Sequence, residues 1–324
     1  MLIASAPHRI TFAGGGTDVA DFYRTHGSTI LGAAIDLYAT VVIAQPIGKT
    51  SHRYRLSYSK HEDVNHVDEI EHPIIRAALE ELKIERSIHI TSIADVPAST
   101  GLGTSSAFTV ALLAALHRLE GRTVSSRYLA SQAIYIEREV AGLQGGEQDQ
   151  WWSAIGGLNV LNFTGSEVKI TAIEDRLLHD HVNACSYLIA PSVVRNSSDE
   201  AEKLNMRISK GDVEGLLQNL KTARSLEKAI CEKSSPLPTK VSALGQSLTR
   251  TWQAKRQYTN IGPELKKLDE LLSRTNIPMK LCGAGYSGFV YVLANEEQAR
   301  VLREQEISLV KIGIAKKGVG VLHG

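Results

Sequence analysis

The chain has 324 residues and a mass of 35.3 kDa, which is long enough for two domains. Its hydrophobic content of 43% and charged content of 22% are typical of a globular protein with a large core. The 36 Lys and Arg against 35 Asp and Glu exclude the strong basic excess of a nucleic-acid-binding protein. No apolar run approaches the ~20 residues of a membrane helix, and MLIASAPHRI lacks a signal-peptide core. We therefore expect a cytoplasmic protein that binds neither nucleic acid nor membrane, as a monomer or a homodimer.

The first half of the chain alternates strand and helix patterns. Residues 37–44, 54–58 and 86–93 are rich in β-branched and aromatic side chains and predict strands. Apolar residues at three- and four-residue steps predict a helix over 105–120, with Gly121 as its C-terminal cap. A second helix is expected over 125–141, capped by Ser125 or Ser126 and ended by Gly142. The segment LNVLNF, residues 158–163, ends this half.

The second half begins after a polar stretch near residues 164–170, which we take as the domain boundary. We expect strands at 185–190, 288–294 and 309–315, and charged helices within 197–232, 240–257 and 296–304. The three cysteines (Cys185, Cys231, Cys282) form no CxxC pair and are interpreted as reduced thiols in a core. The histidines show no metal-ligand spacing, so a structural zinc site is not expected.

Three glycine-rich segments stand out: AGGGTD at 13–18, PASTGLGTSSA at 97–107 and CGAGYSG at 282–288. The last one matches GxGxxG by letter, but it leads into a strand and not into a helix, so the dinucleotide-binding interpretation fails. PASTGLGTSSA, in contrast, follows a predicted strand and opens the helix at 105–120. A helix start offers unpaired N–H groups and a positive dipole end, which favours phosphate. The alternative is a capped helix after a flexible turn.

Three further features carry chemistry, each with a plainer alternative. A carboxylate in GGEQDQWW, residues 145–152, is a candidate general base or an acidic turn in solvent. Glu137 borders the apolar stripe of its helix and is a candidate Mg²⁺ ligand or a surface residue. Arg9 and Asp18 flank AGGGTD, where they could hold a polyhydroxylated substrate or form a surface ion pair worth under ~1 kcal/mol.

Together, PHRITFAGGGTD, PASTGLGTSSA, GGEQDQ and KLCGAGYSGF resemble, in this order, the motifs of the GHMP small-molecule kinases. The resemblance spans residues 4 to about 294. Within that superfamily, RITFAGGGTD, IEREVAGLQGGEQDQWWSAIGGLN and VVRNSSDEAEKLN are most similar to the D-glycero-D-manno-heptose 7-phosphate kinases, with the fucose 1-kinases sharing much of the pattern. The resemblance to the GHMP kinases implies an α+β fold of two domains. The first, over 1–165, would be ribosomal-protein-S5-like, and the second, over 166–324, would be ferredoxin-like.

The resemblance also implies roles for individual residues. ATP would be held by residues of the second and third glycine-rich segments, namely Pro97, Ser99, Gly101, Leu102, Gly103, Thr104, Ser105, Ser106, Gly283 and Gly285. Ser105 and Glu137 would ligate Mg²⁺. Asp149 would accept or orient the proton of the attacking hydroxyl, and Arg9 would steady its charge. The sugar side would be formed by Gly15, Gly16, Thr17 and Asp18, with Arg195 facing a phosphate already on the sugar.

The implied function is transfer of phosphate from ATP to the anomeric hydroxyl of heptose 7-phosphate, on the route to nucleotide-activated heptose. Thr104 replaces a serine that the family often has, and it keeps the hydroxyl. Tyr286 and Ser287 interrupt the third glycine run, which makes the substrate less certain than the reaction. The alternatives are a sugar 1-kinase acting on an unphosphorylated sugar such as fucose, and a sugar-binding regulator without catalysis.

Overall fold

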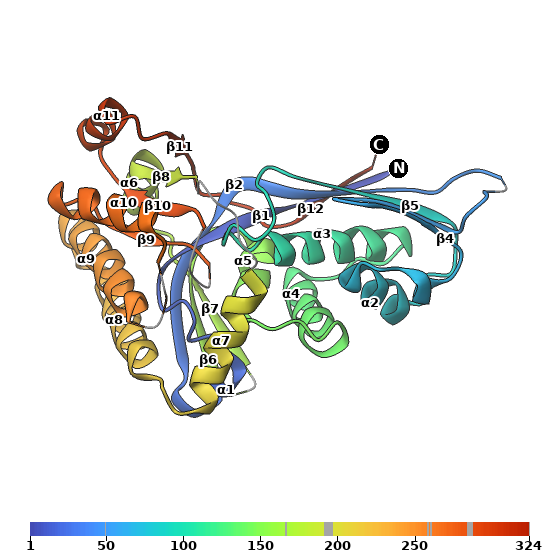
Figure 1. Cartoon of the computed structure of the whole chain (residues 1–324), viewed down its shortest axis with the longest axis horizontal. Coiled ribbons are helices and arrows are strands. Elements are labelled where there is room, and N and C mark those ends of the chain that lie inside the picture. Colours follow the sequence, from blue (N-terminus) through green and yellow to red (C-terminus); the bar gives the residue numbers. More distant parts are fainter. Residues whose placement is uncertain are drawn as a thin grey trace.

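The structure, a computed structural model, describes residues 1–48, 50–165, 167–190, 197–257, 259, 261–283 and 288–323. The smaller of two β-sheets lies at one end of the molecule, the larger one extends from the middle to the other end, and helices pack on both (Figure 1). The larger sheet has eight strands, with the order β12-β1-β2-β5-β3-β4 and with β6 and β7 continuing from β2. The smaller sheet has the order β11-β8-β10-β9 and is antiparallel.

The strands of the larger sheet are β1 (Leu2–Ala13), β2 (Ser28–Ala44), β3 (Tyr54–Ser57), β4 (His61–Val64), β5 (Ile88–Ala94), β6 (Leu158–Thr164), β7 (Glu167–Ala172) and β12 (Gly320–His323). The helices that accompany it are α1 (Ala20–His26), α2 (Pro73–Leu82), α3 (Thr104–Leu119), α4 (Ser126–Tyr135) and α5 (Asp149–Ile155), with a 3₁₀ turn at Val67–Glu69 and a π-helical turn at Ile136–Val140.

The strands of the smaller sheet are β8 (Ser186–Ile189), β9 (Met279–Leu281), β10 (Val290–Leu293) and β11 (Leu309–Lys311). Its helices are α6 (Arg176–Cys185), α7 (Ser197–Ser209), α8 (Glu214–Cys231), α9 (Leu237–Arg256), α10 (Pro263–Arg274) and α11 (Glu296–Glu304).

The long strand β2 organises the larger sheet, because its two halves pair with different neighbours. Residues 39–44 pair with β5, and residues 28–33 pair with β6. On one face, α2, α3 and α4 cover the sheet and form the largest apolar core with it (Figure 1). On the other face, side chains of β1 and β2 share a second core with α6, α8, α9 and the smaller sheet. This second core joins the two sheets into one body.

Strand β1 lies between these two cores and carries Arg9, the first of the predicted site residues in the sequence. Ile10 and Phe12 pack into the second core, and neighbouring side chains of a strand point to opposite faces. Arg9 and Thr11 therefore point toward the starts of α3 and α5. The last strand, β12, returns to pair with β1, and β7 pairs with β6, so both belong to the larger sheet. The division at residues 165 and 166 stays a prediction.

No helix among the described residues combines the length and the apolar character needed to cross a membrane.

Candidate active site

The centre of the site is an ion pair between Arg9 on β1 and Asp149 at the first turn of α5. Arg9 Nε donates to Asp149 Oδ1 at 2.6 Å, and Nη2 donates to Oδ2 at 2.7 Å. Side-chain exposure is 8% for Arg9 and 20% for Asp149, so the carboxylate has the more open side. A bidentate pair of this kind fixes both groups in position. Each Asp149 oxygen retains a lone pair for a substrate hydroxyl.

Arg9 also holds the glycine loop that the sequence predicted to bind phosphate. Its backbone N–H donates to the Leu102 carbonyl at 3.1 Å, and its Nη1 donates to the Gly101 carbonyl at 2.7 Å. A methyl group on Gly103 would lie 3.1 Å from Asp149 Oδ2. The surface ion pair between Arg9 and Asp18 that we considered from the sequence is therefore wrong, because Arg9 is buried and pairs with Asp149.

The same loop ends at the N-terminus of α3 in a form suited to an anion. Gly103 is the N-cap with a φ of 74°, and no side chain caps the first turn. The Thr104 hydroxyl is buried without a hydrogen-bond partner among the described residues. Uncapped N–H groups and an unused buried hydroxyl fit the phosphate groups of a nucleotide. Ser99 also has a positive φ, 62°, and Pro97 accepts from the Thr100 hydroxyl.

The third glycine motif packs directly behind this loop. A methyl group on Gly101 would lie 2.5 Å from the Cys282 carbonyl oxygen, and one on Gly283 would overlap Gly101. Both glycines have positive φ angles, 85° and 77°, which are unfavourable for other residues. The Phe289 N–H donates to the Thr100 carbonyl at 3.0 Å and fastens the loop to the strand that follows. The segment around Gly283 therefore supports the phosphate loop from the second half of the chain.

Glu137, the predicted Mg²⁺ ligand, lies in the π-helical turn and is 1% exposed. Its carboxylate accepts from Ser106 at 3.1 Å, from Thr109 at 2.7 Å and from Gln150 at 2.8 Å. Burial raises its pKa, partly opposed by Arg138 and by these donors. Ser105, the other predicted ligand, is exposed, and the structure describes no hydrogen bond between it and Glu137.

These oxygen groups still fit the preference of Mg²⁺, which takes few protein carboxylates and keeps other oxygens from phosphate and water. The described residues hold no cluster of three or more His, Cys, Asp or Glu that could bind a metal ion. A magnesium ion here would rest on one carboxylate, hydroxyls and the nucleotide itself. The roles of Ser105 and Glu137 stay predictions.

Asp18 closes the first glycine motif and holds the segment that presents Asp149. Its carboxylate accepts from Gly16 N–H at 3.0 Å, from Gln148 N–H at 3.1 Å and from Gln148 Nε2 at 3.0 Å. A methyl group on Gly146 would overlap this carboxylate. Burial raises the pKa of Asp18, and the nearby charge of Asp149 raises it further. Asp18 is thus buried and bonds to Gln148, the residue that precedes the catalytic candidate Asp149.

The rest of the predicted sugar loop is also placed by the structure. Gly15 and Gly16 are half-buried, while Thr17 is buried and bonds to the Gly14 carbonyl and to Ser28. The loop is held from the other half of the chain by Asn219 on α8, which accepts from Gly14 N–H at 3.1 Å and donates to the Gly15 carbonyl at 2.7 Å. Sequence reasoning missed Asn219, because a single buried Asn in a charged helix carries no motif.

Two lysines at the site were also missed, Lys255 on α9 and Lys280 on β9, which are 6% and 5% exposed. Lys255 continues the apolar stripe of Leu244, Leu248 and Thr251 at three- and four-residue steps, and this spacing could have revealed it. Lys280 directly precedes the third glycine motif, between Met279 and Leu281, which are both buried.

Arg195, Gly285, Tyr286 and Ser287 lie outside the described residues. The remaining predicted site residues gather around the C-terminal half of β1 and the starts of α3 and α5. Two of them, Pro97 and Ser105, are exposed to solvent.

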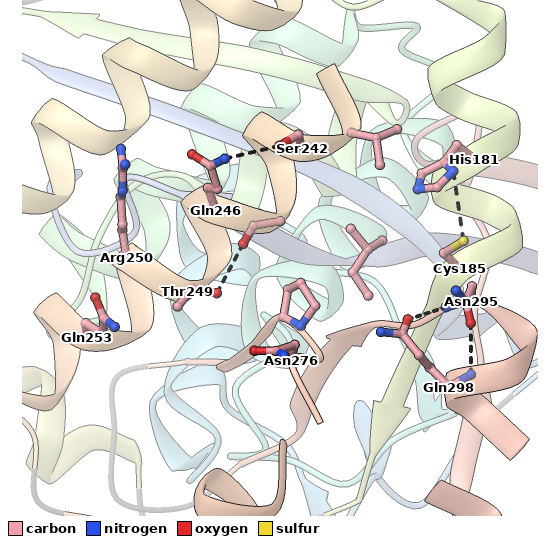
Figure 2. A pocket seen from close by; sticks show the side chains of 14 residues that line it. His181, Cys185, Ser242, Gln246, Thr249, Arg250, Gln253, Asn276, Asn295 and Gln298 are labelled. Carbon is pink, nitrogen blue, oxygen red and sulfur yellow. Dashed lines mark hydrogen bonds between the residues drawn. The ribbon is translucent and has the colours of Figure 1, made fainter. Parts of the chain in front are cut away.

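A pocket of about 610 Å³ lies elsewhere, between α6, α9 and the residues Asn276, Pro278, Leu293, Asn295 and Gln298 (Figure 2). None of the predicted site residues lines it. His181 and Cys185 face each other in it at 4.0 Å, but burial raises the pKa of the Cys185 thiol (Figure 2). A reactive cysteine needs a lowered pKa, so this pair is not an activated nucleophile.

Comparison with known proteins agrees with this geometry. Residues 70–157 match the family described as GHMP kinases N terminal domain. The D-glycero-alpha-D-manno-heptose 7-phosphate kinase of Campylobacter jejuni is 25% identical, over 97% of this chain and 96% of its own length. The L-fucokinase/L-fucose-1-P guanylyltransferase of Bacteroides fragilis is 24% identical, over 66% of this chain but only 23% of its own length.

Among solved structures, a D-glycero-D-manno-heptose 1-phosphate kinase from Bacteriodes thetaiotaomicron superposes with a TM-score of 0.76. It is 22% identical, and the superposition covers 100% of this chain and 99% of that one. The predicted fold class is confirmed by this likeness. Residues 70–157 thus match the GHMP kinase N-terminal domain, and the whole chain shares the α+β fold of this solved kinase structure.

Proposed function

We propose that this protein is an ATP-dependent sugar kinase that phosphorylates the anomeric hydroxyl of a heptose 7-phosphate. The observation that carries the proposal is the Arg9–Asp149 pair, which is fastened by Arg9 to the glycine loop at the N-terminus of α3. A carboxylate acceptor and a phosphate loop are the two parts that phosphoryl transfer to an alcohol needs side by side.

In this function ATP supplies the phosphoryl group, and Mg²⁺ supplies charge neutralisation on it. The N-terminal N–H groups of α3 and the Thr104 hydroxyl bind phosphate oxygens. The open side of Asp149 accepts the proton of the sugar hydroxyl or orients it, a contribution of about 10²- to 10⁴-fold. Arg9 holds that carboxylate in place and adds a positive charge near the reacting oxygen. Glu137 is the carboxylate that would help to hold Mg²⁺.

The choice of heptose 7-phosphate rests on sequence and on relatives. The C. jejuni relative extends over almost the whole chain, which supports a heptose phosphate substrate. The B. fragilis relative supports the alternative, a kinase for an unphosphorylated sugar such as fucose. Arg195 is the residue we expect to face the existing phosphate.

An ADP-release assay with ATP and Mg²⁺ tests the proposal on heptose 7-phosphate, fucose, mannose, galactose and mevalonate. Phosphorus NMR then locates the new phosphate on the product. We expect turnover with heptose 7-phosphate and a new resonance at the anomeric position. Turnover of an unphosphorylated sugar alone would transfer the assignment to the sugar 1-kinases and remove the role proposed for Arg195.

The matched variants are Asp149→Ala in the site and Asp63→Ala in an exposed ion pair on β4. Asp149→Ala should abolish phosphate transfer and keep ATP binding, because the phosphate loop is built from other residues. Asp63→Ala should retain wild-type turnover. Undiminished turnover in Asp149→Ala would refute the mechanism. A wild-type protein that binds sugar but releases no ADP would instead favour the regulator without catalysis.

A further inference from the structure

Lys255 and Lys280 are buried cations that the mechanism above does not use. Lysine is almost never fully buried unless a negative partner compensates its charge. In the part of the chain that the structure describes, no carboxylate lies within 4 Å of either ammonium group, and both donate only to backbone carbonyls. Lys240 on α9 shows the usual arrangement, because it is equally buried but pairs with Asp175 at 2.6 Å.

The two lysines differ in how much of their bonding capacity is in use. Lys255 Nζ donates to the carbonyls of Leu281 and Gly283, which supports the turn behind the phosphate loop. Lys280 Nζ donates to the Thr11 carbonyl at 2.8 Å. An ammonium group has three donors, so Lys280 has two that no described residue accepts.

Lys280 lies on the sugar side of the Arg9–Asp149 pair. Its Nζ is 3.7 Å from the point that a Cβ on Gly15 would occupy, in the predicted sugar loop. The Thr11 residue that it contacts donates its hydroxyl to Gln148, which immediately precedes Asp149. The charged groups that act on Lys280 are Arg9, Asp18 and Asp149, the nearby Cys282 is a buried thiol whose pKa burial raises, and Lys280 in turn lowers the pKa of Lys255.

The electrostatic cost of this arrangement also indicates an anion. Burial, helped by the charge of Arg9, lowers the pKa of Lys280 to about 8, and burial with the charges of Lys280 and Arg9 lowers the pKa of Lys255 to about 7. Lys280 is influenced by Arg9 and by two carboxylates, Asp18 and Asp149, neither of which bonds to it, whereas the carboxylate that acts on Lys255 is Glu200. Groups that cost stability in the free protein are commonly kept for binding. A phosphate group beside Lys280 would place a negative charge next to an ammonium that no described carboxylate contacts, and would accept from its two remaining donors.

We propose that Lys280 binds a phosphate oxygen beside Gly15, at the junction of the sugar loop and the Arg9–Asp149 pair. The inference deepens the proposed function and rests on it only for the source of the anion. That source is either the phosphoryl group in transfer or the phosphate that the sugar already carries. Both present the same oxygen chemistry to the ammonium group.

Calorimetric titration of the intact protein with inorganic phosphate tests the site without any kinase assay. Lys280→Met removes the ammonium and keeps the length of the side chain, and Lys240→Met is the matched control at a buried lysine that has its own carboxylate. We expect phosphate affinity to fall about 10- to 100-fold in Lys280→Met, the effect of losing charge-assisted hydrogen bonds, and to stay unchanged in Lys240→Met. Wild-type affinity in Lys280→Met, or an equal loss in both variants, would overturn the proposal.

A second measurement needs no variant. Sulfate keeps its charge between about pH 6 and 9, whereas Lys280 loses its proton as pH rises through this range. Binding requires the protonated lysine, so the sulfate affinity of the wild-type protein should fall as pH rises. Constant affinity across this range would contradict the role of Lys280.

Steady-state kinetics of Lys280→Met then identifies the source of the phosphate. A rise in KM for heptose 7-phosphate with no change for the unphosphorylated heptose assigns Lys280 to the sugar's own phosphate. A fall in kcat on both sugars assigns it to the group in transfer. Unchanged kinetics on both would count against the inference. Should the wild-type protein phosphorylate no sugar, the proposed function fails, while the phosphate titration still decides the role of Lys280.

Discussion

The substitution Gly101→Ala tests whether the phosphate loop depends on contact with the third glycine motif. The new methyl group would lie 2.5 Å from the Cys282 carbonyl oxygen and 2.8 Å from the Gly283 nitrogen, which is closer than real side-chain carbons approach. Overlap of this kind in a packed region costs about 1–3 kcal/mol. The φ of 85° adds about 1–2 kcal/mol for a residue with a Cβ. The expected loss in the free energy of unfolding is therefore about 2–5 kcal/mol.

The control is Gly121→Ala, at the end of α3. Gly121 has a φ of 70°, similar to that of Gly101, but a methyl group there would meet nothing within 4 Å. This variant has the cost of the backbone conformation without the overlap, about 1–2 kcal/mol. The difference between the two variants isolates the contact between the loops.

Urea denaturation measures both free energies of unfolding, and the KM for ATP reports on the loop itself. We expect Gly101→Ala to lose more stability than Gly121→Ala and to raise the KM for ATP, because the carbonyl that Arg9 contacts moves with the loop. Equal losses in the two variants, with unchanged KM values, would refute the argument that the third motif supports the phosphate loop.

Three further changes test single residues. Arg9→Met should lower kcat about 10²- to 10³-fold in steady-state assays, and Arg9→Lys should recover only part of it because an ammonium cannot form the bidentate pair; full activity in Arg9→Met would contradict its role. Glu137→Gln should raise the Mg²⁺ concentration needed for half-maximal activity about 10-fold or more, and an unchanged Mg²⁺ dependence would exclude Glu137 as a ligand. His8 is buried without partners for its ring nitrogens among the described residues, and burial lowers its pKa to about 4. As pH falls, His8 of the unfolded chain binds a proton before His8 of the folded protein does. From about pH 6.5 down to 4 the free energy of unfolding of the wild-type protein should therefore fall by about 3 kcal/mol relative to that of His8→Phe, measured by denaturation. A constant difference between the two proteins would show that His8 is not neutral when folded.

The sequence predicts helices best where periodicity and capping agree. The expected helix over 105–120 is α3 at Thr104–Leu119, the one over 296–304 is α11 with the same bounds, and Ser125 caps α4 as expected. The helix predicted over 125–141 changes to a π-helical turn at Ile136–Val140, which contains Glu137. The local pattern does not reveal that change, because it leaves the apolar stripe continuous.

Strands buried on both faces were harder to predict. The prediction of a strand over 37–44 covers only the second half of β2, because residues 28–35 are buried on both sides and do not alternate. β1 was missed for the same reason, with Pro7 and His8 interrupting the apolar pattern. Its edge partner β12 lies more than 300 residues away in the sequence, and short-range patterns carry no information on such pairing.

Within the site, local chemistry singled out the loop that we predict to bind phosphate, and little else. The separate roles of Arg9 and Asp149 followed from the family resemblance, but their pairing across 140 residues of sequence was not predicted. Lys280 was overlooked because lysine is usually a surface residue, and its burial depends on β9 lying behind β1. Such residues become functional only through the tertiary arrangement of the two halves of the chain.

Glycines of the loops around the site share a physical role that differs from flexibility. Gly101 lies against Gly283 and Gly146 against Asp18, and in both pairs the partner occupies the space of a side chain, while a Cβ on Gly103 would make a tight contact of 3.1 Å with Asp149. Arg9 then bonds to the loop and to Asp149 at once, so the position of the carboxylate depends on every one of these contacts. Because phosphoryl transfer relies on positioning, a shift of about 1 Å can cost 10²-fold in rate. Close packing, and not mobility, is therefore what these glycine-rich loops contribute to the site.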